Sequence, residues 1–248
     1  MSRKLLKISY LGTDYCGWQV QPNGISVQET LQNALEKLLG ERPGVSGCSR
    51  TDSKVHANEF YCHFDSNTAI PNKGIVFGLN KILPDSIAVF KCSDVPDDFH
   101  ARYSSKGKTY IYKMYVSNIR DPFLLNRALC IKGNIDIIRA EEFCKFIMGK
   151  HDFASFSSAK RTVENTVRTV YDCSISKNGN NFEFSVTADG FLYNMVRILV
   201  GTMLDYSKGK ISAADLILAF KSENRNLLGP TVPPYGLYLN KVLYEEEV

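Results

Sequence analysis

The sequence predicts an α+β protein with mostly antiparallel sheets and helices packed on one side of them. Short segments in which apolar and polar residues alternate, as they do in half-buried strands, are interspersed with segments whose apolar residues recur at helical spacing. The tripeptide Asn178-Gly179-Asn180 separates two alternating segments and indicates a hairpin, which joins antiparallel strands. With 248 residues, 44% of them hydrophobic, the chain is long enough for one large domain or two closely packed ones.

Strands and helices alternate in the N-terminal half, which we expect to span residues 1–105. The helix expected at 27–39 has the clearest boundaries, because Ser26 is a favourable N-cap, Glu29 completes a capping box and Gly40 ends the apolar periodicity. The expected elements are, in order, a strand at 4–10, a helix at 27–39, a strand near residue 60, a helix or turn at 73–82 that ends before Pro84, and a strand at 87–92.

The C-terminal half, expected at 106–248, shows the same mixture. Its most apolar segment, Phe191 to Leu204, is too short to cross a bilayer and contains Asn194 and Arg197, so we predict a buried helix there. The expected elements are, in order, a strand at 108–117, a helix at 139–148, paired strands at 167–176 and 181–187, helices at 191–205 and 213–220, and a closing strand at 236–244.

The cysteine and histidine content argues against disulfides and metals. The seven cysteines are odd in number and include no CxxC pair, and the four histidines show no metal-ligand spacing. The N-terminal segment starts basic, but Lys7 interrupts its apolar part, which is too short for a signal peptide. We therefore expect a cytoplasmic protein in a reducing compartment with no metal.

Charge is distributed unevenly along the chain. The net charge is +4, yet residues 100–170 contain 13 Lys and Arg against 6 Asp and Glu. Such a surplus, interleaved with aromatic residues, is typical of a track for a phosphate backbone with stacking platforms, but a solvated basic face would have the same composition. The aromatic residues concerned are Tyr103, Tyr110, Tyr112, Tyr115, Phe123, Phe153 and Phe156.

Several catalytic motifs can be excluded. Gly107-Lys108-Thr109 has the ending of a phosphate-binding P-loop, but Arg102 occupies the position of its first glycine and an expected strand follows where a helix is required. Neither a GxSxG elbow nor a dinucleotide fingerprint is present, and no second carboxylate accompanies Asp52 as in a glycosidase pair. Any chemistry would therefore depend on a single Asp.

Asp52 and Arg50 lie in a stretch of small and polar residues that enters the expected strand near residue 60. A carboxylate at the edge of a rigid strand could face a ligand while being held in place. A second interpretation is a polar turn in which Asp52 caps a backbone N–H and Arg50 forms a surface ion pair. Asp52 itself could be the partner of Arg50 in this ion pair, because residues two apart share a face of an extended chain. Local residues leave both interpretations open.

Arg197 is a cation within the apolar helix predicted from residue 191. Burial of an unpaired guanidinium costs several kcal/mol, so we expect an anionic partner, which could be a structural carboxylate or a catalytic Asp that must stay ionised. Tyr110 and Tyr112 share one face of their expected strand, where core packing is the plain interpretation.

Taken together, these segments resemble the TruA family of tRNA pseudouridine synthases over nearly the whole chain. Five ordered blocks at family-like spacing make the resemblance specific. They are Tyr10 to Gln19, Arg50-Thr51-Asp52 with Val55-His56-Ala57, Phe99-His100-Ala101-Arg102 leading to Tyr110-Ile111-Tyr112, Gly190 to Arg197, and Gly236-Leu237-Tyr238-Leu239.

The resemblance implies two ferredoxin-like (RRM-like) halves joined around a central basic cleft, usually in a homodimer that binds one tRNA. It implies isomerisation of uridines 38, 39 and 40 in the anticodon stem-loop, without a cofactor. Asp52 would be the nucleophile, and Arg50 would hold the flipped nucleotide. Tyr110 would contact the target uracil, Leu237 would pack under it and Arg197 would be the partner of Asp52.

The chain departs from the family pattern next to Asp52. Ser49, Ser53 and Lys54 replace the expected Gly, Ala and Gly, so the loop has less freedom to adopt positive φ. The sequence also leaves two other functions open, a non-catalytic RNA-binding module or chaperone and an Asp-dependent enzyme that acts on small nucleosides. It does not separate attack on the sugar, attack on the base and formation of a glycal.

Overall fold

The structure, a computed structural model, describes residues 1–158 and 165–245. The chain leaves its first unit after Lys106 and returns to it at Tyr238: one unit comprises Met1–Lys106 with Tyr238–Val248, and the other comprises Gly107–Leu237. The first boundary lies one residue from the division expected at 105/106. The closing strand, which we expected with the C-terminal half, falls almost entirely in the first unit, where it pairs with β3 (His56–Ser66).

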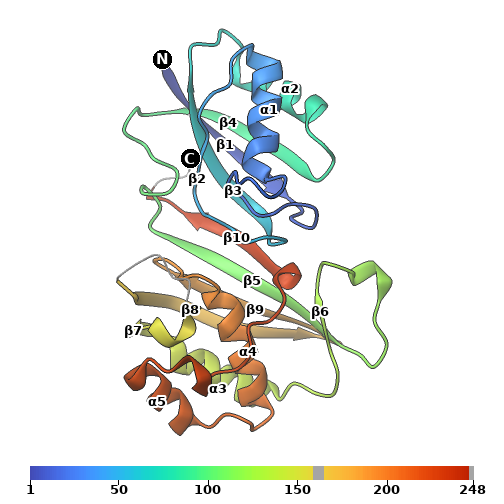
Figure 1. Ribbon diagram of the computed structural model, residues 1–248, viewed down its shortest axis with the longest axis vertical. Coiled ribbons are helices and arrows are strands. Elements are labelled where there is room, and N and C mark those ends of the chain that lie inside the picture. The colour runs from blue at the N-terminus through green and yellow to red at the C-terminus, as the bar shows by residue number, and fades with distance from the viewer. Residues whose placement is uncertain (159–164, 246–248) are drawn as a thin grey trace. The chain divides into compact units, whose positions relative to one another are not determined.

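The first unit is built on a mostly antiparallel sheet in the order β4-β1-β3-β10 (Figure 1). β1 is antiparallel to both β3 and β4, whereas β10 runs parallel to β3, with Tyr238 opposite His56. β2 pairs with β3 further along, with Gly47 opposite Cys62. The strands are β1 (Ser2–Tyr10), β2 (Ser46–Gly47), β3 (His56–Ser66), β4 (Ile87–Val95) and β10 (Leu237–Leu243).

Two helices pack on this sheet, α1 (Val27–Leu39) and α2 (Asn72–Ile82). The predicted boundaries of α1 are confirmed, because Ser26 accepts a hydrogen bond from the backbone N–H of Glu29 and Gly40 closes the helix at φ 78°. A Cβ added to Gly78 of α2 would lie 2.5 Å from Leu38. The two helices therefore approach each other closely, and the glycine makes this approach possible.

The second unit contains an antiparallel sheet in the order β5-β9-β8-β7, with β6 parallel to the other side of β5. The predicted hairpin is confirmed, since Asn178 and Asn181 pair across a turn in which Gly179 has φ 58°. The strands are β5 (Gly107–Val116), β6 (Leu129–Ile131), β7 (Gly149–Asp152), β8 (Val167–Asn178) and β9 (Asn181–Ala188).

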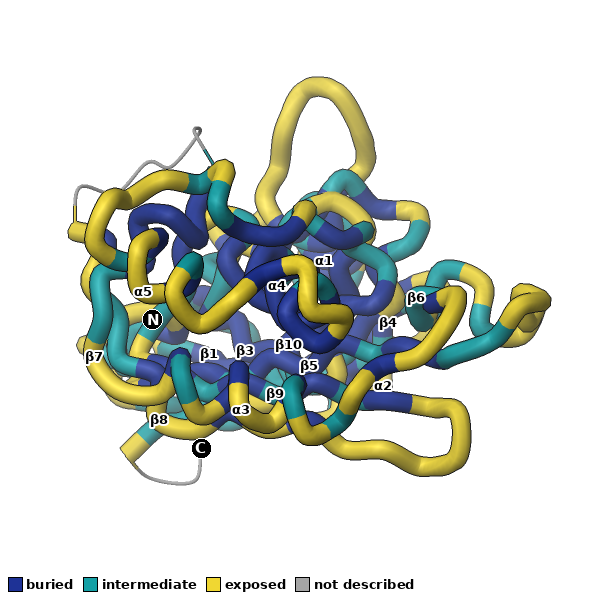
Figure 2. Tube along the Cα trace, turned by 90° about the horizontal axis from the view of Figure 1, so that it is seen from below, coloured by how far each residue is buried: buried dark blue, intermediate teal, exposed yellow. Residues whose placement is uncertain are grey.

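The helices of the second unit are α3 (Ile137–Ile147), α4 (Met195–Ser207) and α5 (Ala213–Ser222), with short 3₁₀ turns at Pro122–Leu124, Ala154–Phe156, Arg225–Leu227 and Pro234–Gly236. As predicted from its apolar run, α4 is buried along most of its length (Figure 2). A full capping box occurs at Ser212 and Asp215 of α5. Within residues 1–158 and 165–245, no helix has the length and apolar character needed to cross a bilayer.

The start of α4 differs from the prediction. We expected the helix from Phe191, but it begins at Met195, because Asn194 adopts a left-handed conformation with φ 61° and ψ 5°. This backbone conformation interrupts the helical path, although the apolar residues before it continue the pattern. The break places Arg197 in the first turn of α4 instead of near its middle.

Candidate active site

The loop that carries Asp52 is anchored at both ends. At its start, the backbone N–H of buried Cys48 donates to Tyr61 of β3 at 2.8 Å, and at its end buried Val55 leads directly into β3. Asp52 is half-buried between these anchors. A carboxylate in this position is held by the sheet and remains accessible.

Side chains alternate along this loop. Thr51 is buried, and its hydroxyl lies 2.8 Å from the hydroxyl of Tyr10 on β1. Its neighbours are more accessible, since Asp52 is half-buried and Arg50 is exposed. Arg50 forms no ion pair with any residue in the described part of the chain, so the alternative of a direct Arg50–Asp52 pair is not observed. Its guanidinium is available to an anion.

A tight turn follows Asp52. The backbone N–H of Val55 donates to the carbonyl of Asp52 at 3.2 Å, and Lys54 adopts a left-handed φ of 65°. The carbonyl of Tyr15 accepts from the Lys54 N–H at 3.1 Å and from the Ser53 hydroxyl at 3.3 Å. The position where the family pattern has glycine thus requires positive φ, and Lys54 adopts it at a cost of about 1 kcal/mol.

The Gly12–Trp18 segment packs directly on the Asp52 loop through backbone atoms of both segments. A Cβ on Gly17, whose φ is 108°, would lie 2.6 Å from the carbonyl oxygen of Thr51, and a Cβ on Gly12 would lie 2.0 Å from that of Val55. The N–H of Trp18 donates to the Thr51 carbonyl at 3.2 Å. The first and second blocks of the resemblance are therefore one structural assembly, in which the two glycines permit the contact.

His56 joins this assembly to β10. Its Nδ1 accepts from the N–H of Gly12 at 2.9 Å, and its ring stacks on Tyr238 with centroids 4.6 Å apart. The ring is fully buried. Sequence reasoning gave His56 no role beyond its motif, since its partners lie 44 and 182 positions away along the chain.

The second unit carries the other candidate residues. Tyr110 on β5 is buried and meets Phe191 edge-on at 5.0 Å between centroids. Tyr112 shares that face, is fully buried, and donates its hydroxyl to the carbonyl of Pro233 at 2.7 Å. Burial raises the pKa of Tyr112. Tyr112 is thus a core residue, in agreement with the core packing that we expected for both tyrosines.

Arg197 is half-buried in the first turn of α4. Its Nε donates to the carbonyl of Val232 at 2.7 Å, and one terminal nitrogen donates to Oδ1 of Asn194 at 2.7 Å. Two neutral oxygens of its own unit therefore fix the guanidinium plane. Leu237, the last residue of the unit, is buried and begins β10 directly after the Pro234–Gly236 turn.

Asn194 had no role in the sequence interpretation. The signal that could have found it is the residue type, since Asn tolerates the left-handed conformation better than most residues and stands directly before an apolar helical run. Its partner Arg197 lies only three positions further along the chain, so this contact is local in sequence.

The interleaved aromatic residues of 100–170 are mostly not stacking platforms. Tyr103 and Phe123 are 76% and 87% exposed, whereas the other five are buried, so only these two present an exposed ring on which a base could stack. The basic residues are spread over several elements, and Lys160 and Arg161 lie outside the described residues. Seven of the described cations are exposed: Arg102, Lys106, Arg120, Arg127, Lys132, Lys145 and Lys150.

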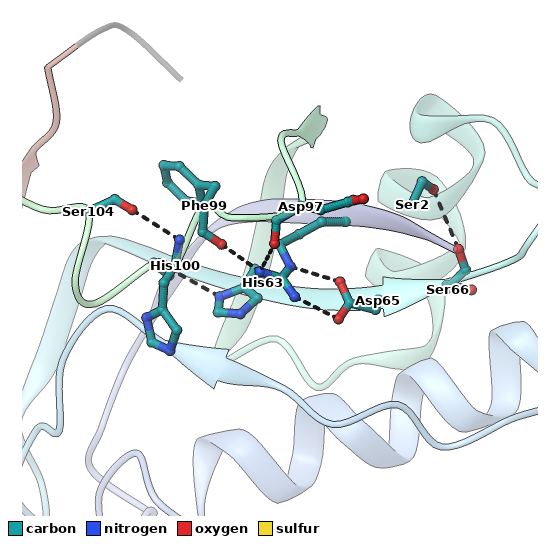
Figure 3. A network of polar contacts seen from close by, with 10 residues as sticks. Ser2, His63, Asp65, Ser66, Asp97, Phe99, His100 and Ser104 are labelled. Carbon is teal, nitrogen blue, oxygen red and sulfur yellow. Dashed lines mark hydrogen bonds and ion pairs between the residues drawn. The ribbon is translucent and has the colours of Figure 1, made fainter.

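A polar network anchors the third block of the resemblance to β3 (Figure 3). Arg3 forms a two-point ion pair with Asp65, at 2.8 Å for each contact, and donates to the carbonyls of Asp97 and Phe99. The Nδ1 of His63 accepts from the N–H of Ala101 at 3.2 Å. This network explains why the segment after β4 follows the end of β3.

The two histidines of this network have depressed basicity. Burial, aided by His100 and Arg3, lowers the pKa of His63 to about 4, and burial with Arg3 lowers the pKa of His100. His63 is therefore a neutral hydrogen-bond acceptor at pH 7.

The described residues contain no group of three or more His, Cys, Asp or Glu that could hold a metal ion. All seven cysteines lie in the described part of the chain and are free thiols.

Fold and site together define a mixed α/β protein of two sheet-and-helix units, with an accessible carboxylate on a rigid loop of the first and a restrained guanidinium in the second. A family model described as tRNA pseudouridine synthase matches residues 144–245. The tRNA pseudouridine synthases A of Thermoanaerobacter sp. (strain X514) and Clostridium acetobutylicum are 41% and 42% identical to this chain, each over 98% of this chain and 100% of its own length. The chain belongs to the tRNA pseudouridine synthase family, and the resemblance seen in its motifs is confirmed.

A remote likeness to a solved structure accompanies these relatives. The crystal structure of the archaeal box H/ACA sRNP Nop10-Cbf5 complex matches with a TM-score of 0.39 and 13% identity, over 81% of this chain and 44% of that chain.

Proposed function

We propose that this protein isomerises uridine to pseudouridine in tRNA. The observation that carries the proposal is identity of about 40% to tRNA pseudouridine synthases A along nearly the whole chain. The Arg50-Thr51-Asp52 loop supports it, because a half-buried carboxylate on an anchored loop is suited to covalent or proton-transfer chemistry. We place the reaction in the cytoplasm.

The reaction needs no external reagent. The C1′–N1 glycosidic bond of uridine breaks, the uracil rotates and a C1′–C5 bond forms. The proton on C5 is lost, and N1 gains one, so product and substrate have the same composition. Ionised Asp52 would attack the sugar or the base, or remove a sugar proton to give a glycal, and each route requires it next to the nucleotide.

The remaining candidate residues would hold the substrate. Arg50, exposed and without an ion pair in the described residues, would bind the displaced nucleotide through its phosphate. Tyr110 would contact the target uracil and Leu237 would pack under it. Arg197 would keep Asp52 ionised as its counterion.

The finer features of the proposal concern substrate and assembly. The substrate would be uridines 38, 39 and 40 of the anticodon stem-loop, bound by a homodimer. Each unit would be a ferredoxin-like half, supported by two helices packed on an antiparallel sheet, α1 with α2 in the first and α3 with α4 in the second.

Asp52→Asn tests the role of the carboxylate. Single-turnover release of tritium from tRNA labelled at uracil C5 should fall by at least about three orders of magnitude, because Asn is neither a nucleophile nor a base. Asp85→Asn, which removes an exposed carboxylate of the same unit, is the control and should retain the wild-type rate.

Wild-type turnover by Asp52→Asn would refute the catalytic role of Asp52. A wild-type protein that binds tRNA but leaves no pseudouridine, detected by mass spectrometry after carbodiimide treatment, would instead identify a non-catalytic RNA-binding module. Activity on free uridine that does not depend on salt would favour an enzyme for small nucleosides.

A further inference from the structure

Asn194 caps α4 in an unusual way. An N-cap Asn normally has an extended backbone, and its side-chain oxygen accepts from a backbone N–H of the first turn. Asn194 instead has φ 61° and ψ 5°, and its side chain caps no backbone N–H of α4. Its carbonyl still accepts the first helical hydrogen bond, from the N–H of Ile198 at 3.0 Å.

The side chain of Asn194 is directed to Arg197. Its Oδ1 accepts from a terminal nitrogen of the guanidinium at 2.7 Å. Arg197 is the third residue of α4, so its backbone N–H is one of the groups that an ordinary N-cap side chain would satisfy. The amide thus gives up conventional capping and binds the arginine side chain.

A second acceptor holds the other side of the guanidinium. Nε of Arg197 donates to the carbonyl of Val232 at 2.7 Å, and the N–H of Val232 donates back to the carbonyl of Arg197 at 3.3 Å. The segment before Val232 is fixed against α4, since the N–H of Gly229 donates to the Thr202 hydroxyl at 3.2 Å. The Val232 carbonyl is therefore a rigid contact.

Both acceptors are neutral, which has an electrostatic consequence. They determine where the guanidinium lies and how its plane is turned, and neither of them contributes a negative charge. A guanidinium has five N–H donors, of which these two contacts use two. These two contacts therefore orient the guanidinium without neutralising it.

We infer that Asn194 is a positioning residue, which holds the Arg197 guanidinium in its working orientation through Oδ1 during pseudouridine formation. The inference rests on the function proposed above for Arg197. Asn194 itself touches neither substrate nor reacting atoms in this scheme. Loss of its amide would leave Arg197 charged but poorly oriented, and small misplacements of such groups slow catalysis.

Asn194→Gly isolates the side chain, because glycine adopts the left-handed conformation without strain. We expect the single-turnover rate constant at saturating tRNA to fall roughly 10- to 100-fold, with the dissociation constant for tRNA and the thermal unfolding midpoint unchanged. The matched control is Asn126→Gly, the same substitution at another left-handed Asn of the second unit, where φ is 57°. This control should retain the wild-type rate.

A double-mutant cycle with Arg197→Ala tests whether the effect passes through the arginine. Arg197→Ala should be nearly as slow as Asp52→Asn, and adding Asn194→Gly should slow it no further. Wild-type turnover by Asn194→Gly, or an equal further loss in the Arg197→Ala background, would overturn the inference. Wild-type turnover by Arg197→Ala would refute the role of Arg197 and the inference with it, while activity loss in Asp52→Asn would still support the enzyme itself.

Discussion

Lys54 adopts a backbone conformation that is unfavourable for any residue with a Cβ. Its φ of 65° is required by the turn that follows Asp52, in which Tyr15 accepts from Lys54 and Val55 donates to Asp52. The turn survives because these contacts and the anchors of the loop at Cys48 and Val55 determine the path of the chain.

Lys54→Gly should therefore stabilise the protein. Glycine relieves the left-handed strain but loses more backbone entropy on folding, so we expect the free energy of unfolding to rise by about 0.5 to 1 kcal/mol. Urea denaturation measures this change. Ser53→Gly is the control, because Ser53 lacks positive φ and should lose stability on substitution. A lower free energy of unfolding in Lys54→Gly would contradict the claim that the positive φ of Lys54 is strained.

The buried histidine His63 couples stability to pH. Its pKa is about 4 in the folded protein and near 6.5 in the unfolded chain. Between these values the unfolded chain binds more protons, so stability is complete above pH 6.5 and falls as the pH is lowered through 4. Protonation would remove the acceptor of the Ala101 N–H and place a charge beside Arg3 (Figure 3).

The wild type should lose about 2 kcal/mol of unfolding free energy between pH 7 and pH 4 through this histidine, a value reduced for partial solvation. His63→Asn is the comparison, because its Oδ1 replaces the acceptor and does not titrate. Urea denaturation at both pH values should show a smaller loss for His63→Asn. Equal losses in the two proteins would rule out His63 as the source.

At the scale of elements, two backbones cross at a glycine contact in the second unit. Gly201 of α4 faces Pro230, and a Cβ there would lie 1.8 Å from the Pro230 carbonyl oxygen. Gly229 approaches the same helix, with an added Cβ 2.3 Å from the Gly201 carbonyl. This crossing brings the segment that ends at Val232 onto α4, and it thereby supports the Arg197 contact.

Gly201→Ala should separate these backbones. We expect a loss of about 3 kcal/mol or more in unfolding free energy, because backbone atoms would have to move instead of a flexible side chain. Thermal or urea unfolding provides the measurement, with Gly44→Ala as the control, since a Cβ there meets nothing within 4 Å. A Gly201→Ala protein as stable as the wild type would show that the crossing tolerates expansion.

At the scale of the whole molecule, the chain order does not follow the division into units. β10 comes last, after the entire second unit, but it pairs with β3, where Tyr238 lies opposite His56. The same strand begins at Leu237, one of the candidate substrate-binding residues of the second unit. The chain therefore passes between the two units twice, from Lys106 to Gly107 and from Leu237 to Tyr238.

Much of the fold could be predicted from the sequence because its causes are local. The cap and stop of α1, the hairpin at Gly179 and the alternation of β9 each depend on a few neighbouring residues. The Arg50-Thr51-Asp52 loop was identified in the same way, by small and polar residues before a strand. The family followed from the order and spacing of such blocks.

Only the tertiary structure decided the features that depend on distant partners. The pairing of β10 with β3 joins residues 182 positions apart, and the Val232 contact that orients Arg197 spans 35. Local pattern favoured a helix from Phe191, yet the left-handed Asn194 delays it. The sequence by itself determined most of the strands and helices and the loop that carries Asp52, whereas long-range hydrogen bonds determined how Lys54 and Arg197 are held.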